Sequence, residues 1–324
     1  MTRGKTRRIS PDRIGEYRIE KQLTTTSAYA VYQAIHRVLP RRAVIKVMFE
    51  PVFDPVAAPV QVLREACMLE LLHHPGVVRI YEAGLLPDRR AWLAHELIEG
   101  TATTSLLEPG AMDRIDAIAL LRDIAEVLDH AHSRGVVHGG LFPDRIVLTG
   151  LSRGFPLCIA DWSDVRAHDA SPIPHVPTTM TWHYSAPELA AGEAIDDRAD
   201  VFSLGVIGYE LLTGQLPSRV QIATSEHERS HALLEQQCPD APPELTSLVD
   251  RMLSYDPKHR PTSAEIHEEL LVLTDRLGSV DGPHGASIRI RQPKWTPPLR
   301  FDPAHDQDRT NRIERRMPRS DEEG

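Results

Sequence analysis

Short runs of β-branched, aromatic and other apolar residues recur through the first hundred positions, and polar or turn-forming residues separate them. Runs of this length and composition predict β-strands, here at residues 17–23, 30–34, 43–48, 77–81 and 91–97. One stretch differs, because Val62, Ala66, Leu69 and Leu72 recur at helical spacing until Pro75. That periodicity predicts a helix that ends before the proline.

Helical periodicity dominates after Gly100. Apolar residues repeat every three or four positions in four stretches, which predicts helices within residues 115–128, 201–211, 245–252 and 266–277. Gly135 and Gly214 follow the first two stretches and are typical helix-ending residues. Shorter strands are expected at residues 136–138, 146–149 and 157–160. A strand-rich lobe at 14–97 followed by a helix-rich lobe at 101–277 predicts an α+β fold.

Composition separates the two ends of the chain from its middle. Residues 281–324 contain six prolines, with nine basic and eight acidic residues, which predicts a flexible tail over 278–324. Residues 1–13 are predicted to be a flexible basic arm. The body at 17–280 holds 23 basic and 36 acidic residues, so we expect it to bind no nucleic acid.

Two further features bear on the compartment. The chain has no run of 18 apolar residues, so no membrane span is predicted. Its three cysteines are widely spaced and fit neither a disulfide framework nor a zinc site. Cysteines of this kind indicate a reducing compartment, and we expect a cytoplasmic protein.

Seven short motifs follow one another along the chain: Ala43-Val44-Ile45-Lys46, Glu65 followed by His74-Pro75, the loop from Val137 to Arg145, Asp161-Trp162-Ser163, Ala186-Pro187-Glu188, Asp200-Val201-Phe202-Ser203-Leu204-Gly205, and Asp256 to Pro261. In order and spacing they resemble the motifs of the bacterial-type Ser/Thr protein kinases, and the resemblance covers about residues 14 to 277. The resemblance implies a bilobal protein-kinase-like fold, with a small β-rich lobe and a larger helical lobe.

The resemblance also assigns roles to residues that are retained. Lys46 would contact the ATP phosphates and pair with Glu65, although the same pair could simply hold the helix against the sheet. Glu96 and Ile98 would lie in the hinge beside the adenine, and Asp161 would bind Mg²⁺. Structural roles fall to three further residues, Asp200, Glu188 and Arg260.

The chain departs from the family at the loop that covers the phosphates. The family's three glycines let backbone N–H groups approach the phosphates closely. Their places are taken here by Thr24, Thr26 and Tyr29. Because all three residues carry side chains, we expect ATP and Mg²⁺ to bind weakly.

The catalytic loop departs further. The family's His-Arg-Asp triplet is His138-Gly139-Gly140 here, so the aspartate that serves as the base is a glycine. Phe142 stands at the lysine position and Arg145 at the asparagine that holds a second metal ion. Asp144 is the loop's one carboxylate and the only candidate for a substitute base.

These losses predict a pseudokinase, that is, a catalytically impaired kinase homologue that acts as a regulatory or scaffolding module. Its partner would be a protein, either an active kinase or a phosphothreonine-binding protein. The alternative is an enzyme: a residual Ser/Thr kinase or another ATP-dependent transferase that uses Lys46, Glu65 and Asp161.

Overall fold

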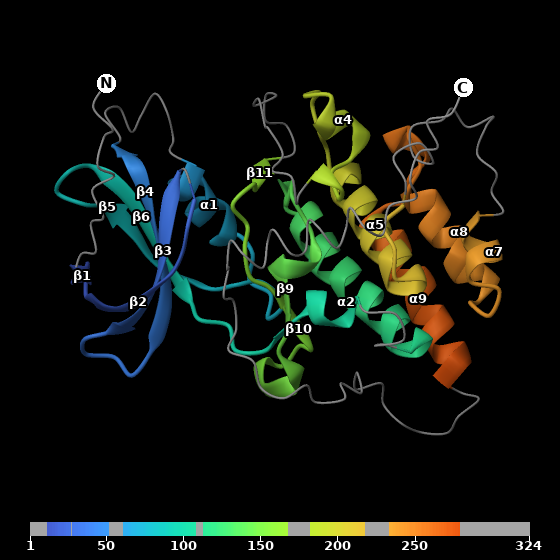
Figure 1. Cartoon of the computed structure of the whole chain (residues 1–324), viewed down its shortest axis with the longest axis horizontal. Coiled ribbons are helices and arrows are strands. Elements are labelled where there is room, and N and C mark those ends of the chain that lie inside the picture. Colours follow the sequence, from blue (N-terminus) through green and yellow to red (C-terminus); the bar gives the residue numbers. More distant parts are fainter. Residues whose placement is uncertain are drawn as a thin grey trace, which may run out of the picture. The chain divides into compact units, whose positions relative to one another are not determined.

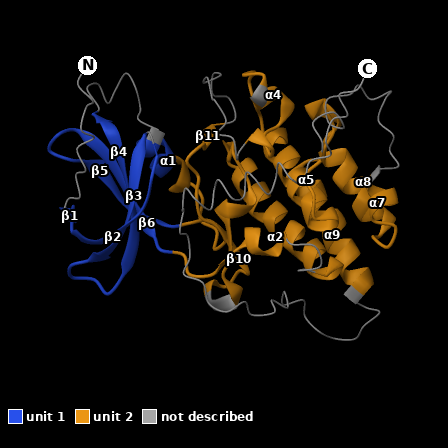
Figure 2. Ribbon diagram, viewed as in Figure 1, with its two compact units in different colours: residues 1–67, 79–97, 299–301 blue, residues 68–78, 98–298, 302–324 orange. Residues whose placement is uncertain are grey.

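The computed structural model describes residues 12–26, 28–51, 61–107, 113–167, 182–217 and 233–278. The described chain separates into two compact units (Figure 2). Unit 1 contains the described residues up to 67 together with 79–97, and unit 2 contains residues 68–78 and the described residues from 98 onward. The chain therefore passes from unit 1 into unit 2 at residue 68 and returns to unit 1 at residue 79.

Unit 1 is an antiparallel six-stranded sheet with one helix. The strand order is β1-β2-β3-β4-β6-β5, so β5 is an edge strand and β6 lies inside the sheet. The strands are β1 Arg13–Ile14, β2 Tyr17–Thr25, β3 Tyr29–His36, β4 Arg42–Pro51, β5 Ile80–Leu85 and β6 Arg90–Glu96, and the helix is α1 Gln61–Leu69 (Figure 1).

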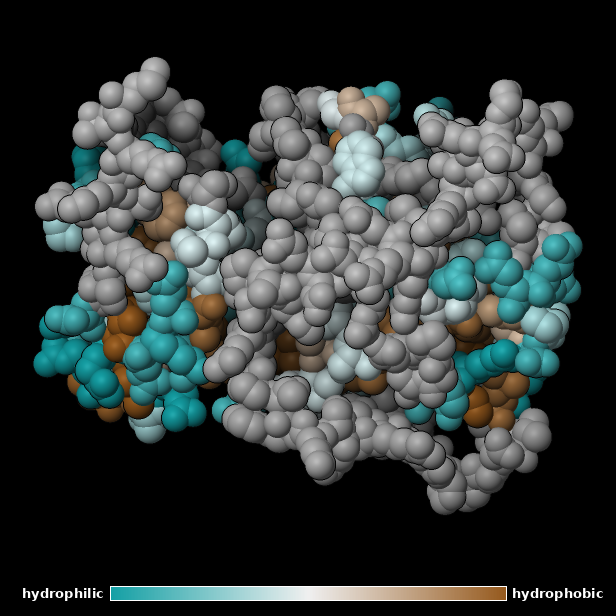
Figure 3. Space-filling view, viewed as in Figure 1, coloured by the Kyte–Doolittle hydropathy of each residue, from teal (hydrophilic) through white to brown (hydrophobic). Residues whose placement is uncertain are grey.

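Alternating burial explains why these segments form a sheet. Ala30, Tyr32 and Ala34 of β3 are buried while their neighbours are more exposed, which is the period of two expected for a strand with one covered face. The central strand β4 is buried over a continuous run, from Ala43 to Val47. On the visible face, polar and hydrophobic residues are interleaved over this unit (Figure 3).

Unit 2 is mainly helical. Its long helices α2 and α5 carry the core, and almost every residue of α5 from Ala199 to Glu210 is buried. Helix α5 ends at Gly214, whose left-handed φ of 70° favours glycine. The helices are α2 Arg114–His132, α4 Pro187–Ala190, α5 Arg198–Thr213, α7 Leu233–Gln237, α8 Pro243–Met252 and α9 Ser263–Gly278.

Short strands and single 3₁₀ turns of unit 2 position the loops discussed below. Three strands pair in the order β10-β9-β7, and two more pair as β11-β8, all antiparallel. The strands are β7 Thr101–Ala102, β8 Val136–Val137, β9 Ile146–Leu148, β10 Leu157–Ile159 and β11 Arg166–Ala167. The 3₁₀ turns are η1 Thr103–Leu106, η2 Pro143–Arg145, η3 Gly150–Arg153 and η4 Pro257–His259.

The predicted α+β, protein-kinase-like fold class is confirmed. One strand prediction was wrong, because the residues expected as a strand at 77–81 form one only from Ile80. Val77 and Val78 are instead buried in unit 2, where Val77 bridges Ile159 of β10. The apolar residues Val77 and Val78 therefore indicated burial and not a β-strand. Short apolar runs do not distinguish these two cases.

Several predictions fall wholly or mostly outside the described residues. The tail over 278–324 and the arm over 1–13 are of this kind, except that Arg13 belongs to β1 and Gly278 ends α9. Among the helices that the structure describes, none combines the length and the apolar character that a membrane crossing needs.

Candidate functional site

The sheet of unit 1 places Lys46 and Glu65 together. Lys46 lies in the middle of β4, paired with Val31 of β3 and Leu93 of β6, and Glu65 comes from α1. The Nζ atom of Lys46 lies 2.6 Å from Oε2 of Glu65, and both residues are buried. The predicted ion pair is therefore formed. A buried pair of this kind suits a phosphate contact or a purely structural link, because each charge satisfies the other.

Tyr29 lies against the same lysine. Its ring centroid is 5.2 Å from the Nζ atom of Lys46, within the range of a cation–π contact. Next to it, the hydroxyl of Thr26 accepts hydrogen bonds from the backbone N–H groups of Ala28 and Tyr29. Thr24 pairs with Val31 across the hairpin. Side chains thus occupy the hairpin and cover the lysine where a glycine-rich loop would leave backbone N–H groups exposed.

The predicted hinge residues belong to different units. Glu96 ends β6 in unit 1, and its carboxylate accepts a 2.7 Å hydrogen bond from the backbone N–H of Arg79. Ile98 belongs to unit 2 and is buried. Their role beside an adenine remains a prediction.

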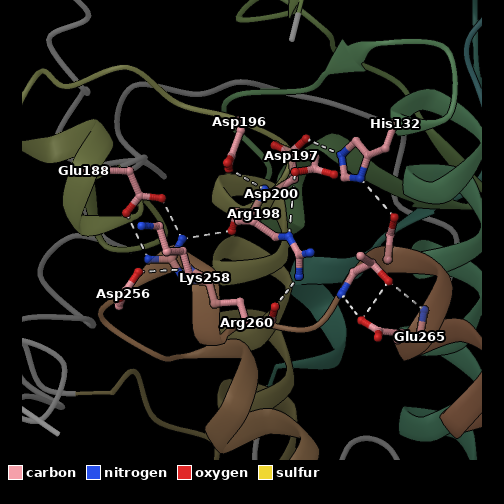
Figure 4. Close-up of polar contacts among 12 residues, drawn as sticks. His132, Glu188, Asp196, Asp197, Arg198, Asp200, Asp256, Lys258, Arg260 and Glu265 are labelled. Atoms are coloured by element: carbon pink, nitrogen blue, oxygen red, sulfur yellow. Dashed lines mark hydrogen bonds and ion pairs between the residues drawn. The ribbon is translucent and has the colours of Figure 1, made fainter.

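The backbone of the catalytic loop is held by Asp200 at the start of α5. Its two carboxylate oxygens accept hydrogen bonds of 2.7 and 2.8 Å from the N–H groups of His138 and Gly139. His132 of α2 lies 2.9 Å from the same carboxylate and contacts Ser263 through its other ring nitrogen (Figure 4). Burial opposes ionisation of Asp200, but the hydrogen bond and charge of His132 outweigh it and hold the pKa of Asp200 below its usual value.

His138 is fully buried and neutral. Burial lowers its pKa to about 4. Its Nδ1 accepts from the N–H of Gly140 at 3.3 Å, so Nε2 carries the hydrogen and donates to the carbonyl of Asp161 at 3.0 Å. The ring also packs on Trp162 at a centroid distance of 4.6 Å. A neutral, fully bonded imidazole of this kind links two loops and is not placed to take a substrate proton.

Gly140 lies where the family carries its base, and the space for a side chain there is already filled. A methyl group added to Gly140 would lie 2.6 Å from Oδ2 of Asp164 and 2.8 Å from Nη1 of Arg145. Gly139 is constrained differently, because its φ is +73° and an added methyl would meet the backbone carbonyl of Asp164 at 2.8 Å.

Arg145 forms the centre of a charged cluster in unit 2. Its Nη1 donates to Oδ2 of Asp164 at 2.6 Å and to the carbonyl of Gly140 at 2.8 Å. Its Nε lies 3.1 Å from Oδ2 of Asp161. The other carboxylate oxygen of Asp161 accepts from the backbone N–H and the hydroxyl of Ser163. The residue predicted to bind a metal ion is therefore already engaged by the protein.

Phe142 and Asp144 occupy the remainder of the loop. Phe142 is buried, and the guanidinium of Arg145 lies 4.9 Å from its ring centroid. It packs as part of the core and offers no charge to a phosphate. Asp144 lies on η2 and is half-buried. Its role as a substitute base stays a prediction.

The predicted structural pair Glu188–Arg260 is formed in unit 2. Arg260 donates to both carboxylate oxygens of Glu188, at 2.6 and 2.9 Å (Figure 4). It also donates to the carbonyl oxygens of Arg198, Ser254 and Tyr255. The side chain of Arg260 is 0% exposed. This fork joins α4 to the segment around η4.

The residues predicted to hold Mg²⁺ fit the ion poorly. Mg²⁺ requires octahedral oxygen ligands, and a guanidinium provides no lone pair. Arg145 places such a group against Asp161. In the part of the chain that the structure describes, no three His, Cys, Asp or Glu side chains are grouped as a metal site.

Asp164 was not among the residues predicted from the sequence. The sequence indicated Asp164 only indirectly, because a buried arginine such as Arg145 requires a nearby anion. Arg145 and Asp164 are 19 positions apart in the sequence, and only the fold brings β8–η2 and the loop after β10 together.

The fold and the site together define a protein kinase domain. A sequence profile described as the protein kinase domain matches residues 17–272. Because this match covers most of the chain, the chain belongs to the protein kinase domain family.

Several curated proteins similar to this chain are bacterial Ser/Thr kinases. The chain is 30% identical over 299 residues to the serine/threonine-protein kinase pkn2 of Myxococcus xanthus. This match covers 88% of this chain and 36% of the relative. It is 26% identical over 290 residues to PknJ of Mycobacterium bovis, covering 87% of this chain and 47% of the relative. It is 28% identical over 256 residues to PknA of Mycobacterium tuberculosis, and this match covers 76% of this chain and 58% of the relative. The chain thus spans less than two thirds of these relatives' lengths.

Proposed function

We propose that this protein-kinase-family chain is a pseudokinase: it transfers no phosphoryl group and acts as a regulatory or scaffolding module. The observation that carries the proposal is Gly140. Phosphoryl transfer to a hydroxyl needs a carboxylate that accepts the substrate proton, and glycine has none. The Arg145–Asp164 pair occupies the space that such a side chain would need.

The contacts of the phosphate-binding residues support the same proposal. Lys46 is buried, paired with Glu65 and covered by the Tyr29 ring. A nucleotide phosphate would compete with the Glu65 carboxylate and the Tyr29 ring for the ammonium. Asp161 is engaged by Arg145 and Ser163. ATP binding is therefore weak or independent of Mg²⁺.

The second candidate is a residual ATP-dependent kinase or transferase. It is favoured by the retention of Lys46, Glu65 and Asp161, three groups that the family uses on ATP and its metal ion. It requires Asp144 to replace the missing base.

The partner in the proposed function is a protein, either an active kinase or a phosphothreonine-binding protein, and the proposed compartment is the cytoplasm. The kinase-like body at 14–277 would provide the binding surface. Its net charge argues against nucleic acid as the ligand, because acidic residues outnumber basic ones within it.

Transfer of label from γ-labelled ATP separates the two candidates. The full chain, incubated with MgCl₂ and a general protein substrate, is expected to give no transfer above a no-protein blank. The same assay is run on Asp161→Asn and Asp144→Asn, purified identically so that a contaminating kinase would be carried through all three. Transfer by the wild type that either substitution abolishes would overturn the pseudokinase proposal.

A further inference from the structure

A single arginine and two aspartates form a charged cluster beside the loop that contains Gly140. The side chain of Arg145 is 9% exposed, and those of Asp164 and Asp161 are 16% and 38% exposed. Two like charges brought this close repel each other, and a cation between them removes the repulsion. Arginine suits this place because its guanidinium stays charged and presents several donors in one plane.

In the family a divalent metal ion neutralises the aspartate at the position of Asp161. Here the nitrogen atoms of Arg145 lie 3.1 Å from Asp161 and 2.6 Å from Asp164. The guanidinium also donates to the carbonyl of Gly140, which ties the catalytic loop into the cluster. A metal ion added to this arrangement would face a positive charge across a carboxylate that is already bonded.

We infer that Arg145 is the resident cation of this site: it holds Asp161 and Asp164 in place of a divalent metal ion, and Gly140 lacks a side chain because the Arg145–Asp164 pair fills that space. Gly140, Arg145 and Asp164 then form one structural unit. A Gly140→Asp substitution alone would not restore the base, because its side chain would clash with the Arg145–Asp164 pair.

Gly139 provides the contrast. The obstacle at Gly140 is made of two side-chain ends, Oδ2 of Asp164 and Nη1 of Arg145, so it disappears if those side chains are shortened. The obstacle at Gly139 is a backbone carbonyl, and its φ of +73° disfavours any side chain. Shortening Arg145 and Asp164 should therefore reduce the cost of an alanine at position 140 but not the cost of an alanine at position 139.

The first test measures how divalent metal ions, in the absence of nucleotide, change the melting temperature. The melting temperature of the full chain is recorded in MgCl₂ or MnCl₂ and in NaCl of equal ionic strength. Wild type should melt at the same temperature in all three salts. Arg145→Ala should melt lower in NaCl and recover part of the loss in either divalent salt, because a divalent ion can then approach both carboxylates. Asp164→Asn, a milder variant, should lower the melting temperature without gaining a divalent response.

Two results would overturn the inference. One is a specific stabilisation of the wild type by Mg²⁺ or Mn²⁺ that Asp161→Asn abolishes. The other is a melting temperature of Arg145→Ala equal to that of the wild type. If Arg145→Ala fails to fold, Mn²⁺ binding to the wild type, followed by electron paramagnetic resonance, still decides: bound Mn²⁺ that Asp161→Asn releases contradicts the inference.

The second test is a set of alanine substitutions at the two glycines. Gly140→Ala should lower the melting temperature clearly in the wild type and much less in the Arg145→Ala/Asp164→Ala background. Gly139→Ala is the matched control and should lower it equally in both. An equal loss for Gly140→Ala in the two backgrounds would contradict the inference.

The inference concerns the site on which the proposed function rests, but its failure can be told apart from the failure of that proposal. The melting measurements contain no nucleotide, so they report on the cluster and not on phosphoryl transfer. A chain that transferred phosphate would contradict the proposed function and leave these melting temperatures as predicted.

Discussion

At the residue scale, the loop from Val137 to Arg145 is held by polar groups that bond to one another. His138 keeps the histidine of the family triplet but uses both ring nitrogens on backbone groups of Gly140 and Asp161. Asp200 fixes the backbone of the same triplet through two N–H groups. The loop therefore retains its scaffold contacts while the residues that would act on a substrate are replaced.

His138 should make folding stability depend on pH. Its pKa is about 4 in the folded protein, against 6.5 in the unfolded chain, because burial disfavours the charged form. The unfolded chain thus takes up the proton first as pH falls. The stabilisation is complete above pH 6.5 and is lost progressively between pH 6.5 and 4, by roughly 3 kcal/mol in total.

Denaturant unfolding at several pH values between 4 and 7 measures this effect. His138→Phe keeps an apolar ring against Trp162 and removes the titrating group. Its unfolding free energy should fall less steeply with decreasing pH than that of the wild type, by up to about 1.4 kcal/mol per pH unit. Equal slopes would show that His138 does not titrate as its burial implies.

At the element scale, the pair Glu188–Arg260 joins α4 to the segment that precedes α9. Its three additional backbone acceptors leave the guanidinium fully bonded, so the charge is well compensated although it is buried. Because these elements come from distant parts of the sequence, the pair fixes their separation in unit 2.

Removing one partner should be costly. Arg260→Met, which keeps much of the side-chain length, is expected to lower the free energy of unfolding by about 3–5 kcal/mol, because it leaves Glu188 buried without its counter-charge. Arg276→Met is the matched control: its partner Glu244 lies at 2.7 Å, but both side chains are more than half exposed, and little change is expected. Similar losses in the two variants, measured by denaturant unfolding, would contradict the role of burial.

The elements also show what the sequence could and could not predict. Strongly periodic segments such as α2 and α5 lie where the apolar spacing placed them. The glycine cap of α5, Gly214, was visible in the sequence, whereas α2 is capped by Ser133, two residues before Gly135. Lys46–Glu65 and Glu188–Arg260 could be predicted because their motifs resemble those of a family in which these residues pair. The pairing of Arg145 with Asp164 and the burial of Val77 could not, since both depend on contacts between separate segments.

At the scale of the whole molecule, the chain combines the fold of an enzyme family with an altered reaction centre. The kinase profile spans 17–272, and the scaffold residues Asp200, Glu188 and Arg260 make the contacts described above. Unit 1 covers its lysine with Tyr29, and unit 2 bonds its metal-position aspartate to Arg145. In the proposed function, each of these contacts opposes productive ATP binding.

A melting-temperature titration of the full chain with ATP, with and without Mg²⁺, tests this account most directly. A ligand at 100 times its dissociation constant stabilises a protein by about 2.7 kcal/mol, which corresponds to roughly 5 °C or more for a chain of this size. The account predicts no increase that depends on Mg²⁺ at any ATP concentration in the titration. A large increase that requires both ATP and Mg²⁺ would contradict it.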